Sequence, residues 1–357
     1  MPNSSGDHDP VLRVHGYHQL RIKQVVRETD DAVSFVLDVP SELAETFRYR
    51  PGQFCTFRVH IGDDEQLRSY SMSSAPETDR DLTVTVKRVA GGLVSNWMLD
   101  NLSDGDVLEV TKPAGVFCPQ ETGRPVMALC GGSGITPVMS IAKHVLTTTQ
   151  RPVKLLYANR DRASVIFDRA LTALSDRYPG RLELRSHFDS DTGFLAADPV
   201  AAFARRGLDG DFYICGPGPF MDLVESSIGE LGVEPGRIFL ERFLVEQQEK
   251  DAQALAPSAD TATEMPAQVT VILGGKTTVI DYHASDTVLE TARRGGLRPP
   301  FSCEAGNCAT CMAFLKSGSV TMRANNALTD DEVAEGWILT CQSLPSGPDV
   351  IVEYEAL

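Results

Sequence analysis

The sequence predicts a multidomain chain: an antiparallel β-barrel or sandwich, then a parallel α/β domain, then a small α+β domain. A length of 357 residues exceeds what one hydrophobic core usually serves. Turn-separated β-rich runs fill the first third, and apolar strands alternate with helical patterns in the second. The boundaries expected from these shifts are 12–121 for the barrel, 122–245 for the α/β domain, 246–267 for a linker and 268–357 for the last domain.

In the first segment, β-rich runs such as Phe54–Val59 and Leu82–Arg88 lie between turn signals that include Pro51-Gly52 and Gly91-Gly92. Regular short strands with few long helical patterns are typical of an antiparallel barrel or sandwich. The second segment has apolar runs at regular intervals with helical patterns between them, which indicates a parallel sheet. These runs are Val126–Cys130, Val153–Tyr157, Leu182–His187, Phe212–Cys215 and Ile238–Leu240.

The linker has no aromatic residue and is rich in polar, Ala and Pro residues, so it cannot build a core. Beyond it, Gln268–Asp281 alternates around Gly274-Gly275 like a β-hairpin. Thr287–Gly295 has a helical pattern, and Val350–Tyr354 has the pattern of a closing strand. The last segment is therefore a small α+β unit.

Composition restricts the class of function. The net charge of −16 argues against nucleic-acid binding, which requires a basic surface, and suits basic protein partners better. No apolar run is long enough to span a membrane, and the first ten residues lack the elements of a secretory signal. We therefore expect a cytoplasmic protein that binds neither nucleic acid nor membrane; the sequence indicates no oligomeric state. Its eight cysteines then suggest metal ligation or buried thiols rather than disulfides.

Four of these cysteines have a diagnostic spacing. Cys303, Cys308 and Cys311 form C-x₄-C-x₂-C, and Cys341 follows 30 positions later. This is the plant-type [2Fe–2S] ligand pattern, and Gly306 permits the sharp turn that such a loop needs. A structural zinc site is the alternative, but zinc sites usually combine two short hooks. The surrounding hairpin, helix and closing strand resemble the β-grasp plant-type ferredoxin family. The remaining Cys55, Cys118 and Cys130 show no ligand spacing and are expected to be core thiols.

A flavin motif occurs in the first segment. Arg68-Ser69-Tyr70-Ser71 resembles the flavin signature of the ferredoxin–NADP reductase superfamily. The resemblance implies that Arg68 binds the flavin phosphate, that Tyr70 lies against the ring or ribityl chain, and that Ser71 lies near flavin N5. Arginine suits phosphate oxygens, and an aromatic ring shields a flavin face. Taken alone, the motif also fits a core tyrosine followed by an ordinary turn.

The same resemblance implies two further flavin contacts. One strand would lie along the flavin nucleotide, and a glycine-rich helix start would offer backbone N–H groups to its pyrophosphate. A site for a second phosphate favours FAD over FMN. The residues concerned are Val86 and Lys87 on the strand and Gly92, Leu93, Val94 and Ser95 at the helix start.

A glycine-rich turn between an apolar strand and a helix opens the second segment. It lacks the G-K-[ST] of a Walker loop and the full G-x-G-x-x-G spacing. It resembles the GGxGxTP nicotinamide loop of the superfamily, in which the threonine also lies near the flavin. The residues are Gly132, Ser133, Gly134 and Thr136.

Two later motifs complete the expected site. Cys215-Gly216-Pro217 is similar to the superfamily's CGPxx segment, which places the cysteine where nicotinamide meets flavin. Glu241 and Phe243 lie in a segment that resembles the superfamily's closing strand, which places an acid and an aromatic beside the flavin. A buried structural cysteine and an ordinary edge strand are the alternatives. The resemblance thus implies Ser71, Cys215 and Glu241 as the catalytic residues.

The nucleotide preference depends on the end of the strand near Tyr157. Asn159 lies where the adenosine ribose is expected. Asp161 would favour a free 2′-hydroxyl, whereas Arg160 or Arg162 would favour a 2′-phosphate. We expect NADH, with NADPH as the alternative.

The domain order resembles that of reductase components of multicomponent oxygenases, with the 3-ketosteroid 9α-hydroxylase and phenylacetyl-CoA epoxidase reductases the most similar subfamilies. It implies an oxidoreductase that passes electrons from NADH through FAD and [2Fe–2S] to a terminal oxygenase, with a Rieske-type steroid hydroxylase as one candidate. The linker length and residues Glu304 and Asn307 depart from the pattern. The alternatives are a flavin reductase with a small-molecule acceptor and a redox-sensing binding protein.

Overall fold

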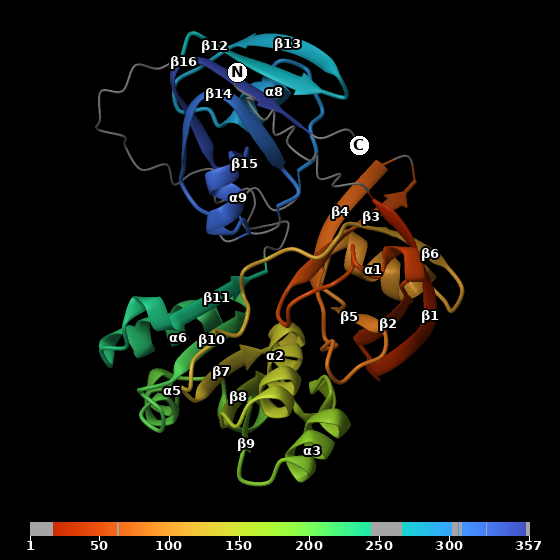
Figure 1. Cartoon of the computed structure of the whole chain (residues 1–357). Coiled ribbons are helices and arrows are strands. Elements are labelled where there is room, and N and C mark those ends of the chain that lie inside the picture. Colours follow the sequence, from red (N-terminus) through yellow and green to blue (C-terminus); the bar gives the residue numbers. More distant parts are fainter. Residues whose placement is uncertain are drawn as a thin grey trace, which may run out of the picture.

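The protein folds around three sheets, one in each predicted domain (Figure 1). The structure is a computed structural model and describes residues 17–62, 64–243, 266–301, 306, 309–325 and 327–354. The beginning of the expected barrel, most of the expected linker, and Cys303, Glu304, Asn307 and Cys308 lie outside the described residues. The predicted fold class is confirmed: an antiparallel barrel, a parallel α/β domain and a small α+β domain follow one another.

The first sheet is antiparallel and has the order β4-β3-β6-β1-β2-β5. A bridge between Met72 and Val84 brings the two edges of this sheet together, so that the sheet closes into a barrel around an apolar core. Helix α1 adds Val94 and Met98 to that core. The elements are β1 (His18–Thr29), β2 (Ala32–Asp38), the short helical turn η1 (Ser41–Leu43), β3 (Phe54–Ile61), β4 (Asp64–Ser71), β5 (Leu82–Lys87), α1 (Leu93–Asn101) and β6 (Val107–Val110).

The second sheet is parallel, with the order β11-β10-β7-β8-β9 and helices on both faces. Along β7, Ala128 and Cys130 pack toward α2 and α3, whereas Met127 and Leu129 pack toward α5 and α6. This two-sided burial explains why the strand is a continuous apolar run. The strands are β7 (Val126–Gly131), β8 (Val153–Asn159), β9 (Leu182–Phe188), β10 (Asp211–Gly216) and β11 (Ile238–Arg242). The helical elements are η2 (Gly132–Gly134), α2 (Ile135–Thr148), η3 (Arg162–Ser164), α3 (Asp168–Arg177), α4 (Asp189–Thr192), α5 (Ala197–Ala204), α6 (Gly218–Glu230) and η4 (Pro235–Arg237).

A buried ion pair holds the chain between the first two domains in place. The guanidinium of Arg151 lies 2.8 Å from the carboxylate of Asp211, and both side chains are almost completely buried. Arg151 also donates to the carbonyls of Gln120 and Arg124 in the connecting segment. The hydroxyl of Tyr213 accepts a hydrogen bond from the Gln120 amide at 2.9 Å. The connection therefore belongs to the packed structure of the α/β domain.

The third sheet has the order β13-β12-β16-β14-β15, with β12 and β16 parallel and helix α8 packed on one face. The predicted hairpin is confirmed, because Gly274 and Gly275 both have positive φ between its two strands. The predicted helix is also confirmed, since Thr287 and Glu290 form a capping box at its start. The elements are β12 (Gln268–Leu273), β13 (Lys276–Asp281), α8 (Val288–Arg294), β14 (Met312–Met322), α9 (Asp330–Glu335), β15 (Trp337–Leu339) and β16 (Ser343–Glu353).

Candidate functional site

A pocket of about 270 Å³ lies where the barrel meets the α/β domain. It brings together six predicted segments that are far apart in the sequence: the RSYS strand, strand β5, the start of α1, the glycine-rich loop before α2, the end of β10 and the end of β11. Its lining residues are Arg68, Ser69, Tyr70, Ser71, Thr85, Lys87, Val89, Gly92, Leu93, Val94, Ser95, Ser133, Thr136, Gly216, Pro217 and Phe243.

The barrel side of the pocket is the end of strand β4. Tyr70 is partly buried, with its ring 5.8 Å from that of Phe57, and it also lines the pocket. It therefore contacts the core while presenting part of its surface to the pocket. Ser71 is 2% exposed, and its hydroxyl makes no hydrogen bond within the described part of the chain. A buried hydroxyl without a partner is unfavourable, so this lining fits a ligand with a polar atom at that position.

The start of α1 forms a second wall. Gly92 precedes the helix, and no side chain caps the first turn, so backbone N–H groups there are available to a ligand. A Cβ atom at Gly92 would lie 2.9 Å from the Ser95 hydroxyl, so a larger residue would crowd this turn. Lys87 adds a positive charge and lies 3.9 Å from Asp31. Amide donors and an ammonium group in one pocket suit a phosphate.

Strand alternation separates the two residues predicted on β5. Lys87 lines the pocket, whereas the side chain of Val86 is fully buried in the barrel core. Thr85 lies on the same side of the strand as Lys87 and also lines the pocket. Sequence reasoning missed Thr85 and Val89, and the two-residue period of the strand is the signal that could have identified Thr85.

The structure shows why the loop before α2 needs glycine, which the sequence alone did not show. A Cβ atom at Gly134 would lie 2.1 Å from the carbonyl oxygen of Cys215, so this glycine allows the loop to pack directly on β10. Gly132 has a φ of +52°, and its carbonyl accepts a hydrogen bond from the Tyr157 hydroxyl. Neither glycine is among the pocket-lining residues, whereas Ser133 and Thr136 are. Close packing thus positions the loop.

Cys215 and Glu241 do not line the pocket, whereas Gly216 and Pro217 do. Cys215 and Glu241 are paired in register on strands β10 and β11, and both are buried. Burial raises the pKa of the Cys215 thiol well above its ordinary value, and the nearby Glu241 raises it further. The thiol is therefore neutral in the folded protein. Phe243, beyond the end of β11, does line the pocket.

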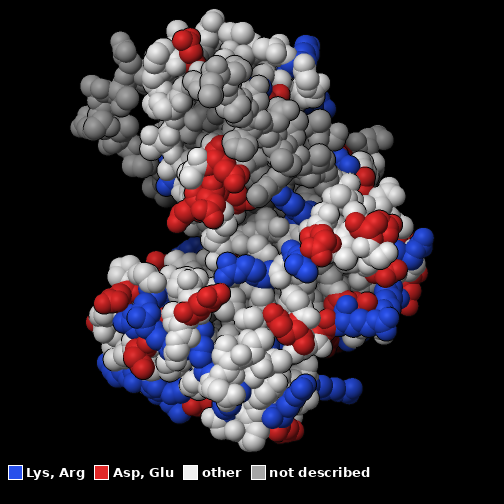
Figure 2. All heavy atoms as spheres, viewed as in Figure 1, with Lys and Arg blue, Asp and Glu red and all other residues white. Residues whose placement is uncertain are grey.

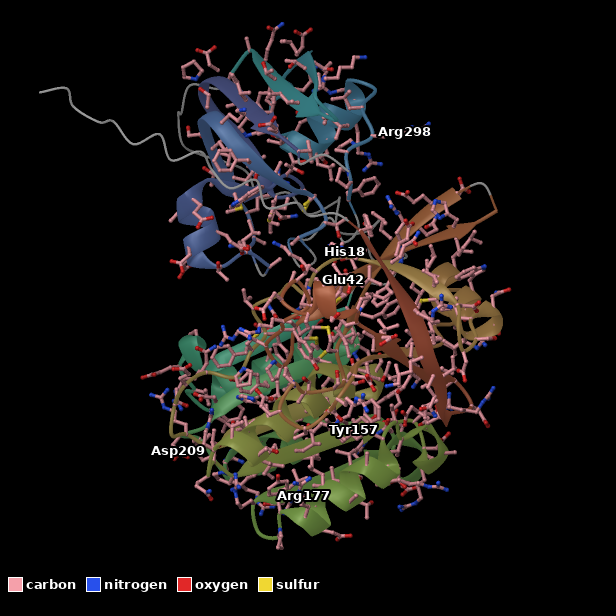
Figure 3. All side chains as sticks on the ribbon, turned by 45° about the vertical axis from the view of Figure 1, so that its right-hand side comes forward. His18, Glu42, Tyr157, Arg177, Asp209 and Arg298 are labelled. Atoms are coloured by element: carbon pink, nitrogen blue, oxygen red, sulfur yellow. The ribbon has the colours of Figure 1, made fainter. Side chains whose placement is uncertain are left out.

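Asn159 is the last residue of β8, Asp161 caps the turn η3, and neither lines the pocket. The side chain of Asn159 is buried, and its amide group has no hydrogen-bond partner among the described residues. Asp161 accepts hydrogen bonds from the Ser164 backbone and from the Arg160 guanidinium, each at 2.9 Å. The Arg160 hydrogen bond lowers the pKa of Asp161, so this carboxylate is ionised. Tyr157, on the same strand, lies within the α/β domain, whereas Arg177 and Asp209 lie at its periphery (Figure 3).

Two of the four predicted cluster ligands of the third domain are among the described residues. Cys311 and Cys341 lie in one buried apolar cluster, and Cys303 and Cys308 lie outside the described residues. Thr340 donates to the Cys311 carbonyl at 2.8 Å and receives a hydrogen bond from Tyr354. Gly306 has a φ of +76°, and a Cβ there would lie 2.7 Å from the Ala324 carbonyl. Two predicted ligands in one buried cluster and a glycine at position 306, where a Cβ atom does not fit, are consistent with an iron–sulfur site.

Three family models match this chain, one in each domain. They are described as an oxidoreductase FAD-binding domain over residues 19–118, an oxidoreductase NAD-binding domain over residues 128–226, and a 2Fe-2S iron-sulfur cluster binding domain over residues 271–346. The predicted cofactors FAD, NADH and [2Fe–2S] are thereby supported. Among the described residues, no helix has the length and hydrophobicity needed to cross a membrane.

Similar proteins cover the chain almost from end to end. The ferredoxin reductase component of 3-ketosteroid-9-alpha-monooxygenase from Mycolicibacterium smegmatis is 39% identical over 94% of this chain and 97% of its own. A component of the 1,2-phenylacetyl-CoA epoxidase from Escherichia coli is 33% identical over 95% and 98%. The structure of phthalate dioxygenase reductase is 26% identical, covers 95% of this chain and 98% of its own, and has a TM-score of 0.58. The chain therefore belongs to the family of oxygenase reductase components that combine an FAD-binding barrel, an NAD-binding domain and a [2Fe–2S] domain.

Proposed function

We propose that this protein is the NADH-dependent reductase of a multicomponent oxygenase and that electrons leave it through the [2Fe–2S] domain. The similarity to two oxygenase components over nearly their whole length supports the reaction. A terminal oxygenase is the proposed electron acceptor, and a steroid hydroxylase is the first candidate because the M. smegmatis relative belongs to a ketosteroid monooxygenase. We propose that it acts in the cytoplasm.

The main observation behind this proposal is a series of contacts between hydroxyl groups that joins the third domain to the barrel, which we call the hydroxyl path. Thr310, the residue before Cys311, has its hydroxyl 3.4 Å from that of Thr56 on strand β3. Thr56 in turn lies 2.9 Å from the hydroxyl of Ser69, which lines the pocket. Thr310, next to the predicted ligand Cys311, therefore packs against the wall of the pocket proposed to hold the flavin. Such proximity is what electron transfer between two bound groups requires.

Different side chains of the pocket would bind different parts of FAD. When bound, FAD accepts a hydride from NADH and releases electrons one at a time to the iron–sulfur cluster. Arg68, Lys87 and the first turn of α1 would hold the negatively charged end of the flavin nucleotide. Tyr70 would cover a ring face, and the Ser71 hydroxyl would donate to a ring atom, for which it has no competing partner among the described residues.

The nicotinamide is proposed to enter from the α/β domain. Thr136 donates to the Ser133 carbonyl at 3.0 Å, which closes the loop at the start of α2 and positions both residues in the pocket. Gly216 and Pro217 line the same side, and the neutral thiol of the preceding Cys215 adds no charge to the site. Because the ionised Asp161 would repel a 2′-phosphate, NADH is the proposed donor over NADPH.

The electron acceptor is proposed to approach the third domain. Asp330, Asp331 and Glu332 lie in the first turn of α9, and an acidic surface is visible on this part of the molecule (Figure 2). Leu328, which precedes this helix, packs in the same cluster as Cys311 and Cys341. A basic partner could therefore bind close to the cluster.

The proposal is tested by removing the cluster without disturbing the flavin. Cys341→Ser should abolish iron binding, because a ligand thiolate is lost, while FAD content is retained. NADH oxidation with ferricyanide should persist, because this small acceptor can take electrons at the flavin. Reduction of cytochrome c should fall by orders of magnitude. Cys118→Ser, a buried cysteine outside the cluster, is the matched control and should retain iron and both activities.

Each alternative function predicts a different result. A flavin reductase with a small-molecule acceptor would keep full activity in the iron-free variant toward its own acceptor and toward cytochrome c. A redox sensor would show slow turnover with NADH in the parent protein. Undiminished cytochrome c reduction by a Cys341→Ser protein shown to lack iron would make the third domain structural or regulatory.

A further inference from the structure

Helix α2 carries a stripe of polar residues among its buried apolar residues. Thr136, Ser140 and Lys143 occur at positions i, i+4 and i+7, which places them on one face of the helix. Thr136 lines the pocket, and Ser140 and Lys143 continue the stripe away from it. A helix that only packs against its own sheet has no need of this stripe. Its polar groups therefore indicate a contact with another part of the protein.

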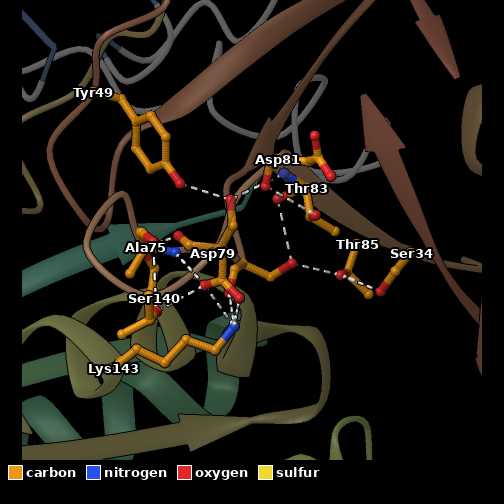
Figure 4. Close-up of polar contacts among 12 residues, drawn as sticks. Ser34, Tyr49, Ala75, Asp79, Asp81, Thr83, Thr85, Ser140 and Lys143 are labelled. Carbon is orange, nitrogen blue, oxygen red and sulfur yellow. Dashed lines mark hydrogen bonds and ion pairs between the residues drawn. The ribbon is translucent and has the colours of Figure 1, made fainter. Parts of the chain in front are cut away.

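That contact is the segment that follows the flavin motif in the barrel. The Ser140 hydroxyl donates to the Ser74 carbonyl at 2.5 Å, and the ammonium of Lys143 donates to the Ser73 carbonyl at 3.2 Å (Figure 4). Lys143 also lies 3.2 Å and 3.0 Å from the two carboxylate oxygens of Asp79. Asp79 in addition accepts a hydrogen bond from the Ala75 amide at 2.8 Å. Lys143 thus connects two points of one barrel loop to one helix.

On its other side, the same segment is held firmly by the barrel. The Ser74 hydroxyl lies 2.6 Å from the Tyr49 hydroxyl and accepts a hydrogen bond from the Thr83 amide at 2.9 Å. The Ser73 hydroxyl lies 2.8 Å from that of Thr85, which lines the pocket. Burial raises the pKa of Tyr49, so its phenol is neutral in the folded protein. The loop that meets α2 is therefore hydrogen-bonded to strand β5, which forms part of the pocket wall.

We propose that Lys143 is a positioning residue for hydride transfer. With Asp79 and the carbonyl of Ser73, it sets where α2 lies relative to strand β4, and so sets the distance between Thr136 at the helix start and Ser71 at the strand end. This inference rests on the flavin and nicotinamide site proposed above. It assigns Lys143 a role through other residues, since its ammonium contacts the barrel loop rather than the pocket.

The rate of hydride transfer depends strongly on distance, so a residue that fixes the position of α2 can affect that rate. Reacting atoms must approach to about 3–3.5 Å, and a displacement of about 1 Å can slow a reaction roughly 100-fold. The Lys143 and Asp79 side chains are 20% and 31% exposed, so water only partly screens their attraction. His144, the next residue on the helix, lies 2.9 Å from Glu77 of the same loop and adds a further contact. Together these contacts resist a sliding motion of the α/β domain on the barrel.

The test is Lys143→Met, which keeps an unbranched side chain only one atom shorter and removes the charge. In the FAD-loaded protein, the rate constant of flavin reduction at saturating NADH should fall roughly 10- to 100-fold. FAD content and the Kd for NADH should stay close to those of the parent. Lys143→Arg should retain most of the rate. Lys23→Met is the matched control: Lys23 pairs with Asp81 at 2.7 Å within the barrel, and its loss should leave the rate unchanged.

Amide hydrogen exchange provides a readout that does not depend on turnover. Residues 73–79 should exchange faster in Lys143→Met than in the parent, and the Lys23→Met control should not show this change there. Asp79→Asn removes the same ion pair from the other side and should reproduce both effects if Lys143→Met fails to fold. A parent-like reduction rate in a folded Lys143→Met protein that retains FAD would overturn the inference. So would a slow rate accompanied by loss of FAD, because it would assign Lys143 to flavin binding.

These outcomes are distinct from a failure of the proposed function. That proposal fails if the parent protein binds no FAD or if NADH does not reduce its flavin. The positioning inference fails only if the parent is reduced by NADH and Lys143→Met is reduced equally fast or has lost its flavin.

Discussion

Ser71 is the last residue of strand β4 and Ser73 lies two positions beyond it; both are buried, but only the Ser73 hydroxyl has hydrogen-bond partners among the described residues. Ser73 lies 2.8 Å from Thr85 and also contacts the Thr83 carbonyl. Ser71 has no partner within the described part of the chain. A buried hydroxyl without a partner lowers the free energy of unfolding by about 1–3 kcal/mol. Ser71 therefore destabilises the fold at the wall of a binding pocket.

This difference predicts opposite effects of two similar substitutions. Ser71→Ala should raise the free energy of unfolding of the flavin-free protein by about 1 kcal/mol, whereas Ser73→Ala should lower it by about 1 kcal/mol. In the FAD-loaded protein, Ser71→Ala should slow flavin reduction by NADH by roughly 10-fold or more, because a hydrogen bond to the flavin is lost. Urea unfolding and stopped-flow absorbance measure the two quantities. Equal destabilisation by both substitutions would show that the Ser71 hydroxyl has a partner in the flavin-free protein.

Local patterns predicted most of the fold. The apolar run on β7 identifies a central strand because both faces of that strand are covered. Gly274-Gly275 identifies a hairpin because a tight turn there needs positive φ at both residues. Thr287 and Glu290 identify a helix start because each satisfies a backbone amide. In each case the physical cause lies within a few residues.

The candidate site was harder to predict from the sequence, because residues that contact one another there lie far apart along the chain. Position 134 requires glycine because a Cβ atom there would collide with the carbonyl of Cys215. Cys215 is 81 positions away, and the sequence does not show that the two residues are in contact. The contact of Lys143 with Ser73 joins residues of two domains. Helical periodicity shows that Lys143 shares a face with Thr136, but it does not identify the loop that meets this face.

The contact between Thr310 and the barrel predicts an effect on electron transfer between domains. Thr310→Val removes the hydroxyl that lies 3.4 Å from Thr56. A neutral hydrogen bond contributes about 0.5–1.5 kcal/mol, so the population of the docked arrangement should fall by a factor of up to ~10. Electron transfer from reduced flavin to the cluster should slow accordingly, while flavin reduction by NADH stays unchanged. Stopped-flow absorbance resolves the two steps.

Thr277→Val is the control for this prediction. Thr277 is an exposed threonine on β13, at the opposite edge of the third sheet from β15. Its substitution should leave both steps unchanged. If Thr310→Val transferred electrons at the parent rate, the hydroxyl path would have no part in coupling the two domains.

The buried thiols predict a loss of stability at alkaline pH. Burial raises the pKa of Cys55, Cys130 and Cys215, and it raises that of Cys118 to about 11. In the unfolded chain these thiols ionise near pH ~8.5. Above that pH the unfolded state loses protons that the folded state retains, so the free energy of unfolding falls by about 1.4 kcal/mol per pH unit for each thiol. For Cys118 the decline ends near pH 11.

Urea unfolding under reducing conditions at several pH values between about 7 and 10 measures this slope. The Cys118→Ala variant should show a shallower decline, since one titrating thiol has been removed. An identical slope in the parent and the variant would mean that Cys118 ionises as readily in the folded protein as in the unfolded chain.

The nucleotide preference is predicted to depend on the charge of Asp161. Asp161→Asn preserves the cap on the following turn, because asparagine accepts the Ser164 amide as well as aspartate does. It removes the carboxylate that would repel a 2′-phosphate. The ratio of kcat/KM for NADPH to that for NADH should therefore rise by a factor of ~10, which corresponds to about 1.4 kcal/mol. Asp209→Asn, an exposed position at the periphery of the same domain, removes an equal charge and should leave the ratio unchanged (Figure 3). An unchanged ratio in Asp161→Asn would exclude this carboxylate from selecting the nucleotide, and a parent protein that preferred NADPH would reverse the proposed donor.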